Sequence, residues 1–140
     1  MFKTVKDQIV TVLETLKGTG KPLKNVFGYP EPSPQEYPCA IVHFAEATEE
    51  RLDTASNFTT VKFVIRVILR EKNTEDANDQ RLDILDSIYS AFRSPTYIDT
   101  LGGVCQKFDF GSTTMLNASE DQPIFGFDLI VQAGKIELIA

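Results

Sequence analysis

The chain has 140 residues, of which 42% are hydrophobic and 24% charged, and this length suits one domain with a core of its own. Its net charge of −6 argues against a protein that wraps tightly around nucleic acid, because affinity for phosphate comes from clustered Lys and Arg. No apolar run is long enough for a membrane span or a secretory signal, so we expect a soluble protein without a membrane partner, made in a cytoplasm.

The first part of the chain predicts one helix, a loop and a surface excursion. Apolar residues at i, i+4, i+7, i+8 and i+11 predict an amphipathic helix over about residues 3–17. After a short strand around Val26 and Phe27, residues 28–38 contain four of the seven prolines and predict a loop. The apolar run "CAIVHFA" predicts a strand, and the charged residues 45–57 that follow predict a surface excursion or arm.

Residues 58–70, "FTTVKFVIRVILR", predict a strand of about 43 Å, roughly twice the usual length, which must bend or overhang its domain. One face of this strand is expected to lie in the core. Its residues are Val61, Phe63, Ile65, Val67 and Leu69. The other face alternates aliphatic side chains with Lys62, Arg66 and Arg70. It is either a wet face on which the basic stems cover the aliphatics, or a face buried against another subunit.

The remaining elements complete an α+β pattern. A helix over residues 74–93 is expected to be capped by Asn73 or Thr74 and to stop before Pro95. Its expected buried stripe is Ala77, Leu82, Leu85, Ile88, Tyr89 and Phe92. Strands are expected over residues 103–110, 124–133 and 135–139. This order predicts a mostly antiparallel sheet with two main helices packed on one face.

The sequence offers little catalytic material. His43 is the only histidine, and on a strand its Cα would lie roughly 13 Å from that of Cys39, too far for a catalytic pair. Cys39 and Cys105 are expected to be buried free thiols. Neither a phosphate-binding loop nor a calcium loop is present. We therefore expect no catalytic residues, no metal and no cofactor, and a protein that is not an enzyme.

The order of these segments resembles a known family. An amphipathic N-terminal helix, a proline-rich passage closing on "YPCAIVHF", the long strand, the helix "NTEDANDQRLDILDSIYSAF", then "GVCQKFDF" and "PIFGFDLIVQ" resemble the tail terminator and minor tail (tail completion) proteins of long-tailed bacteriophages. The resemblance covers nearly the full length and lies in order and pattern. Such proteins assemble as a hexameric ring that caps the tail tube, ends its polymerisation and faces the head connector.

The resemblance implies a structural virion protein at the head-proximal end of the tail, made in the host bacterial cytoplasm. Its implied partners are further copies of itself, the tail tube protein and the head completion or connector protein. DNA would pass through the ring without sequence-specific binding. A ring needs two unlike, complementary patches on each subunit. The residues expected to pair between neighbouring protomers are Lys62, Arg66 and Arg70 with Glu49, Glu50 and Asp53.

Two other functions stay open at the level of sequence. A head–tail connector or a tail tube subunit would belong to the same structural class. A small host enzyme or ligand-binding domain on an α+β scaffold would belong to another class. The oligomeric state separates these classes, because a ring has a multiple of the chain's mass, whereas we expect a monomer of the enzyme or ligand-binding domain.

Overall fold

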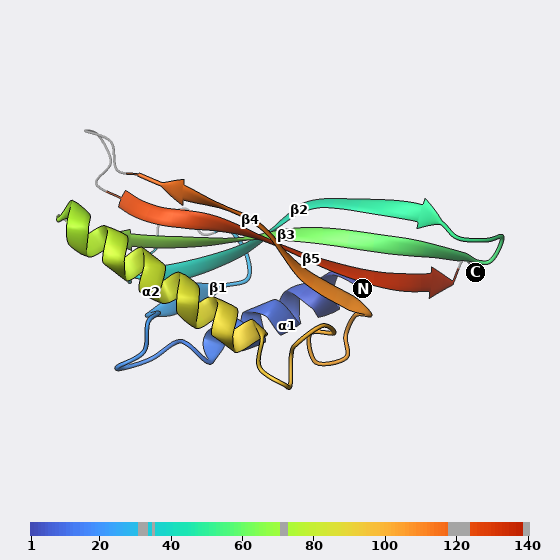
Figure 1. Ribbon diagram of the computed structural model, residues 1–140, viewed down its shortest axis with the longest axis horizontal. Helices are drawn as coiled ribbons and strands as arrows, with labels where there is room; N and C mark the ends of the chain where they lie inside the picture. Colours follow the sequence, from blue (N-terminus) through green and yellow to red (C-terminus); the bar gives the residue numbers. More distant parts are fainter. Residues whose placement is uncertain (31–33, 35, 71–72, 118–123, 139–140) are drawn as a thin grey trace.

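The computed structural model describes residues 1–30, 34, 36–70, 73–117 and 124–138, and shows an α+β fold with a five-stranded mixed sheet and two helices (Figure 1). The elements are α1 (Phe2–Glu14), β1 (Asn25–Phe27), β2 (Cys39–Arg51), β3 (Ser56–Arg70), α2 (Thr74–Phe92), β4 (Lys107–Leu116) and β5 (Ile124–Leu138). The strand order is β1-β2-β3-β5-β4. β1 runs parallel to β2 and the other neighbours are antiparallel, in broad agreement with the expected sheet.

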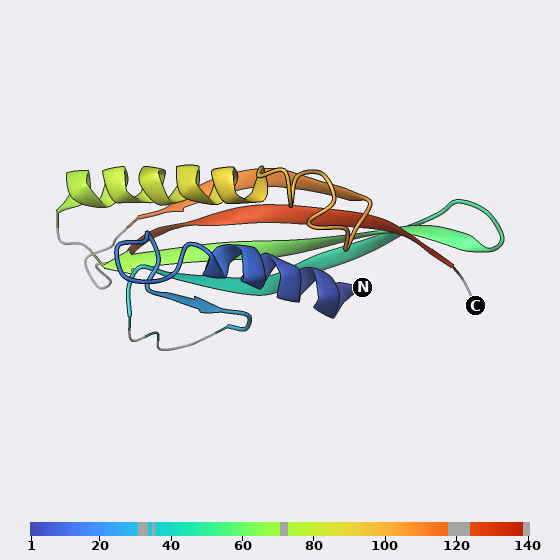
Figure 2. The same ribbon diagram turned by 90° about the horizontal axis from the view of Figure 1, so that it is seen from below.

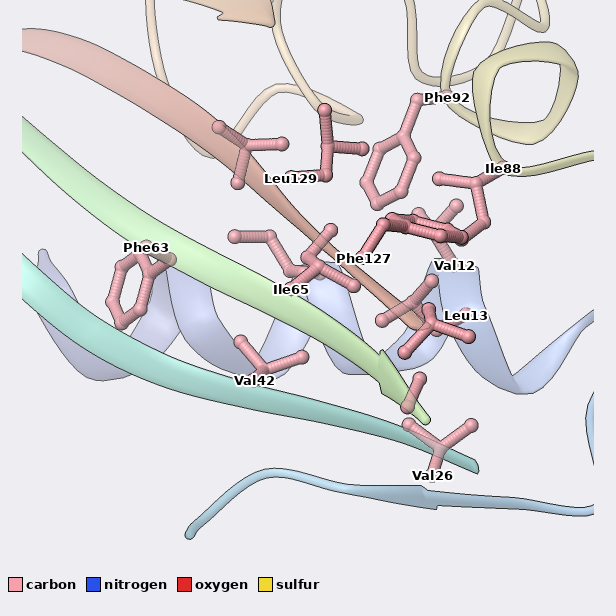
Figure 3. Close-up of a cluster of buried hydrophobic side chains, with 14 of the residues drawn as sticks. Val12, Leu13, Val26, Val42, Phe63, Ile65, Ile88, Phe92, Phe127 and Leu129 are labelled. Carbon is pink, nitrogen blue, oxygen red and sulfur yellow. The ribbon is translucent and has the colours of Figure 1, made fainter. Parts of the chain in front are cut away.

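The core lies between the sheet and both helices. The five residues of β3 expected to face the core are all buried, which confirms that expectation, and their partners on β5 are buried with them. Figure 3 shows side chains of α1 (Val12, Leu13) and α2 (Ile88, Phe92) converging on Ile65 of β3 and on β5. The two helices therefore contribute to one cluster, on one face of the sheet.

α1 buries the apolar stripe that its spacing predicts. Val5, Ile9, Val12 and Leu13 are buried, and the helix ends at Glu14, a turn earlier than expected. Hydrogen bonds of the i→i+3 type close residues 15–17 into a tighter turn. Gly18 follows with φ +136°, a backbone conformation that residues other than glycine rarely adopt.

α2 begins as its sequence predicts but presents a different face. The side chain of Asn73 accepts hydrogen bonds from the backbone N–H groups of Glu75 and Asp76 at 2.9 and 3.2 Å, which is an N-cap. The buried residues are Ala77, Arg81, Ile84, Ile88 and Phe92. Leu82 is 44% exposed, so the expected stripe was wrong at this position, whereas Leu85 and Tyr89 are half-buried and pack against the core. The buried set includes Arg81, whose polar partners no hydrophobic pattern reveals.

The rotation of α2 can be tested by two small truncations. Replacing Ile88 by valine should lower the free energy of unfolding by about 1 kcal/mol, because it removes a methylene from the closed core. Replacing Leu82 by alanine should change the free energy of unfolding by less than about 0.5 kcal/mol, although it removes more atoms. Urea denaturation of both variants checks this, and the reverse order of costs would contradict the rotation.

Three segments differ from the sequence-based expectations. The charged residues 45–57, expected to be a surface excursion or arm, form the paired end of a β-hairpin, because β2 continues to Arg51 and β3 starts at Ser56. Strand pairing needs only backbone groups, so charged side chains do not prevent it. The strand expected over 103–110 begins at Lys107 and continues to Leu116. The two expected C-terminal strands are one, β5, which passes through Gly134; residue 139 lies outside the described residues, as do 31–33 and 35 of the proline-rich loop.

Candidate functional site

Three strands project beyond the part of the sheet that the helices cover. The pairing of β4 with β5 ends at Lys107 and Gly134, and past this point the sheet consists of β2, β3 and β5 alone. Figures 1 and 2 show this three-stranded extension reaching away from both helices. We call it the arm and define it as residues 48–60 and 135–138. It accounts for the predicted overhang of the long strand.

The tip of the arm is held by its own hydrogen bonds. Oδ1 of Asp53 accepts from the backbone N–H of Ala55 at 2.8 Å and from the hydroxyl of Ser56 at 3.0 Å. These donors lower the pKa of Asp53, so this carboxyl group stays ionised. Arg51 donates to the carbonyl oxygens of Asp53 and Thr54 from the other side of the turn. Asp53 therefore stabilises the turn at the tip of the arm within its own chain.

Each basic residue of the long strand has a partner in its own chain. Arg66 and Asp128 stand directly opposite each other and form two hydrogen bonds, Nε to Oδ1 at 2.7 Å and Nη2 to Oδ2 at 2.9 Å. Lys62 forms an ion pair with Glu46 at 3.0 Å.

The third basic residue, Arg70, lies over the ring of Tyr37, with the guanidinium carbon 4.8 Å from the ring centroid. Among the described residues no ion pair joins any of these three basic side chains to Glu49, Glu50 or Asp53. The six residues expected to form contacts between protomers thus lie in two places. The three basic ones have partners within the chain, and the three acidic ones lie on the arm. Asp128 and Glu46 were not identified from the sequence as the partners of Arg66 and Lys62. For Asp128 the signal in the sequence was an aspartate inside an otherwise apolar strand.

The pair of Arg66 and Asp128 should contribute measurably to stability. A double-mutant cycle with Arg66→Ala and Asp128→Ala should give a coupling energy of about 1 kcal/mol, because two charge-assisted bonds join neighbouring strands. The same cycle on Lys62 and Glu46, which is more exposed, should give less than about 0.5 kcal/mol. Urea denaturation of the six single and double variants with their parent measures both coupling energies, and equal couplings would contradict the ranking.

The sheet face opposite the helices is the second candidate surface. Around Arg66 and Asp128 it carries Val64 and Ile130, which are paired across the strands and half-buried, and Ile68. Neither helix covers this face, because both contribute to the cluster on the other side. We call it the open face. His43 and Cys39 of β2 lie on this face, His43 opposite Val64 of β3 and Cys39 opposite Ile68 of β3.

Both cysteines are buried and free. Burial raises the pKa of the Cys39 thiol to about 11, because the thiolate would lose its water, and it also raises that of Cys105. At pH 8 Cys39 of the folded protein should therefore react with a thiol reagent on the order of 100-fold more slowly than in urea, where the ordinary pKa returns, and Cys105 should also react more slowly than in urea. Rapid labelling of the folded protein would contradict this.

Among the described residues, no group of three or more His, Cys, Asp or Glu side chains is placed to hold a metal ion. One wide surface hollow lies between the end of α1 and α2, lined by Thr15, Leu16, Asp86, Ser87, Ser90 and Ala91. No described helix has the length and apolar character needed to cross a membrane.

Comparison with known proteins gives no assignment. No protein-family model matches the chain, and no curated protein matches it. The function is therefore inferred from the arm and the open face.

Proposed function

We propose that this protein is a structural subunit of the tail of a long-tailed bacteriophage. Copies of the chain would form a ring, with six as the expected number, that caps the tail tube, ends its polymerisation and joins the tail to the head connector. The proposal needs neither a cofactor nor a metal. Its partners are other copies of the chain, the tail tube protein and the head completion or connector protein, at the head-proximal end of the tail.

The arm is the observation that carries this proposal. No helix of the described residues lies against either face of its three strands (Figure 2), and exposed aliphatic residues lie at its end: Leu52 at the tip, and Ile136 and Leu138 on β5. Leu138 is 83% exposed. A sheet extension without a core is poorly stable by itself and leaves an open strand edge. Such a structure is expected where a second protein surface covers it.

The open face supports the same conclusion. Val64, Ile68 and Ile130 on this face are only half-buried within the chain, so a partner surface would remove more apolar area from water. The ion pair of Arg66 and Asp128 lies among them and is already complete, so it could enter an interface without an unpaired charge. Two separate surfaces fit a subunit that contacts both its neighbours and a tube.

The mass of the assembly tests the proposal. Light scattering of the purified protein, alone and with purified tail tubes, should detect six times 15.6 kDa, and electron microscopy should find the protein at tube ends. Ile136→Glu in the arm should abolish assembly and capping. Ile98→Glu is the matched control, because Ile98 lies outside the arm and is 47% exposed, against 44% for Ile136.

Two results would contradict the proposal. One is a strict monomer at every concentration, with and without tubes. The other is incorporation of the protein along the tube rather than at its end, which would indicate a tube subunit. Circular dichroism spectra of both variants show whether a loss of assembly reflects the interface or the fold.

A further inference from the structure

Charge is separated along the length of the molecule. The loop of residues 15–24 between α1 and β1 contains Lys17, Lys21 and Lys24 and no acidic residue. In Figures 1 and 2 this loop lies on the far side of the helix-covered body from the arm. We call it the lysine loop. The arm, in contrast, has four carboxylates, of Glu49, Glu50, Asp53 and Glu137, against Arg51 and Lys135.

The lysine loop has a defined shape and exposed lysine side chains. A backbone bridge pairs Lys17 with Leu23, and the N–H of Leu23 donates to Leu16 O at 3.0 Å, so Lys17 and Lys24 lie close together. Both lysines are exposed, and neither side chain has an ion-pair partner in the described part of the chain. Lys21 donates to the carbonyl oxygen of Thr15 at 3.1 Å. The loop thus offers clustered donors to a partner.

The arm offers acceptors along its free edge. β1 pairs with β2 only over Cys39–Ile41, so from Val42 to Arg51 no described strand lies on the outer side of β2. Backbone carbonyl groups on that side can accept hydrogen bonds. Glu49 and Glu50 are exposed and adjacent, so they flank this edge on its two faces, and no ion pair holds them among the described residues.

We infer that the free β2 edge of the arm docks on the lysine loop of a second copy of this chain. This inference rests on the proposed ring and identifies its contact. The two patches are complementary in charge, differ in structure and lie at opposite ends of one molecule. Each copy therefore presents one patch of each kind, which is the heterologous arrangement that a closed ring requires. This contact replaces the expected role of Lys62, Arg66 and Arg70, whose charges are engaged internally.

Edge-to-edge pairing of two arms fits less well. β2 has a register shift between Phe44 and Glu46, and its outer part carries closely spaced carboxylates. Irregular, charged edges resist pairing with another strand. Like charges would also meet if two arms paired through their β2 edges, whereas lysine ammonium groups supply hydrogen-bond donors to both the carboxylates and the free carbonyl groups.

The acidic residues of α2 are the competing partner for the lysine loop. Asp79, Asp83 and Asp86 are exposed, but Asp86 lines the same hollow as Thr15 and Leu16 of its own chain. α2 thus contributes negative charge beside the lysine loop rather than at the opposite end of the molecule. Its carboxylates supply a control for the arm, because the same change of charge can be made there.

A charge-swap experiment tests the contact. In sedimentation velocity, alone and with tail tubes, Glu49→Lys/Glu50→Lys and Lys17→Glu/Lys24→Glu should each weaken association at least about tenfold. Mixing the two variants should restore heterologous contacts between unlike chains, and the quadruple variant should assemble within about threefold of the parent. Raised salt should weaken the parent assembly. Asp79→Lys/Asp83→Lys, with the same change in net charge, should leave association within about threefold.

The outcomes separate this contact from the ring itself. Parent-like rings formed by Glu49→Lys/Glu50→Lys would overturn the contact and leave the ring intact. If the α2 control Asp79→Lys/Asp83→Lys weakens association equally, the contact between arm and lysine loop is also overturned. That result would indicate a contact through α2 or a general effect of net charge. A parent protein that never associates would overturn the ring. If circular dichroism shows that a reversal unfolds the chain, the neutral variants Glu49→Gln and Glu50→Gln take its place, with at least about a threefold loss expected for the pair.

Discussion

Replacing Gly126 by alanine should lower the free energy of unfolding by about 3 kcal/mol or more. Gly126 stands opposite Ile68 in the central pairing of β3 and β5. A Cβ atom at this position would overlap the backbone carbonyl oxygen of Val67 on the neighbouring strand. β3 is paired with β2 on one side and with β5 on the other at this point, so its backbone cannot move aside without breaking that pairing, and the added methyl group must disrupt the pairing of β3 with β5.

Gly134→Ala is the matched control, because Gly134 lies in the same strand. A Cβ atom there would meet the ring of Phe58, which packs over the glycine on the open face. A side chain can rotate away, so the expected cost is about 1 kcal/mol. Urea denaturation at constant pH measures both variants. A cost for Gly126→Ala no greater than that for Gly134→Ala would contradict the close approach of β3 and β5.

Replacing Arg81 by methionine should cost about 2 to 4 kcal/mol. Nη1 of Arg81 donates to the carbonyl oxygen of Leu116 at 2.8 Å and to Oδ1 of Asn117 at 2.9 Å, and it reaches the carbonyl oxygen of Gly126 at 3.4 Å. The guanidinium thereby joins α2 to the ends of β4 and β5 where these strands are paired. Methionine fills a similar volume but leaves buried carbonyl groups without a donor.

The variant Arg81→Lys separates hydrogen bonding from charge. Lysine keeps the positive charge but cannot reproduce the planar arrangement of donors, so it should recover only part of the loss. Thermal and urea denaturation measure the three proteins. Methionine as stable as arginine would contradict the role of these hydrogen bonds. Both Arg81 and Gly126 lie in the helix-covered body, so their variants should change stability without the specific loss of assembly expected for Ile136→Glu.

Several features could be predicted because they depend on neighbours in sequence. The period-two pattern of β3 identified its buried face, and the helical spacing of α1 identified its buried stripe. Asn73 could be recognised as a cap because it bonds to backbone groups two and three residues away. The α+β class followed from the order of such local patterns.

Only the tertiary structure decided the partners and the surfaces. Arg66 and Asp128 are 62 residues apart, so pairing them required the register of β3 against β5. Arg81 is buried through carbonyl partners more than thirty positions away, which no local pattern identifies. Residues 45–57 were expected to be a surface excursion or arm because their side chains are charged, and only the register of β2 against β3 shows that they are paired strands. Sequence thus determined the elements whose interactions are local. Folding decided which charges are engaged internally and which, on the arm and the lysine loop, remain available for a second copy.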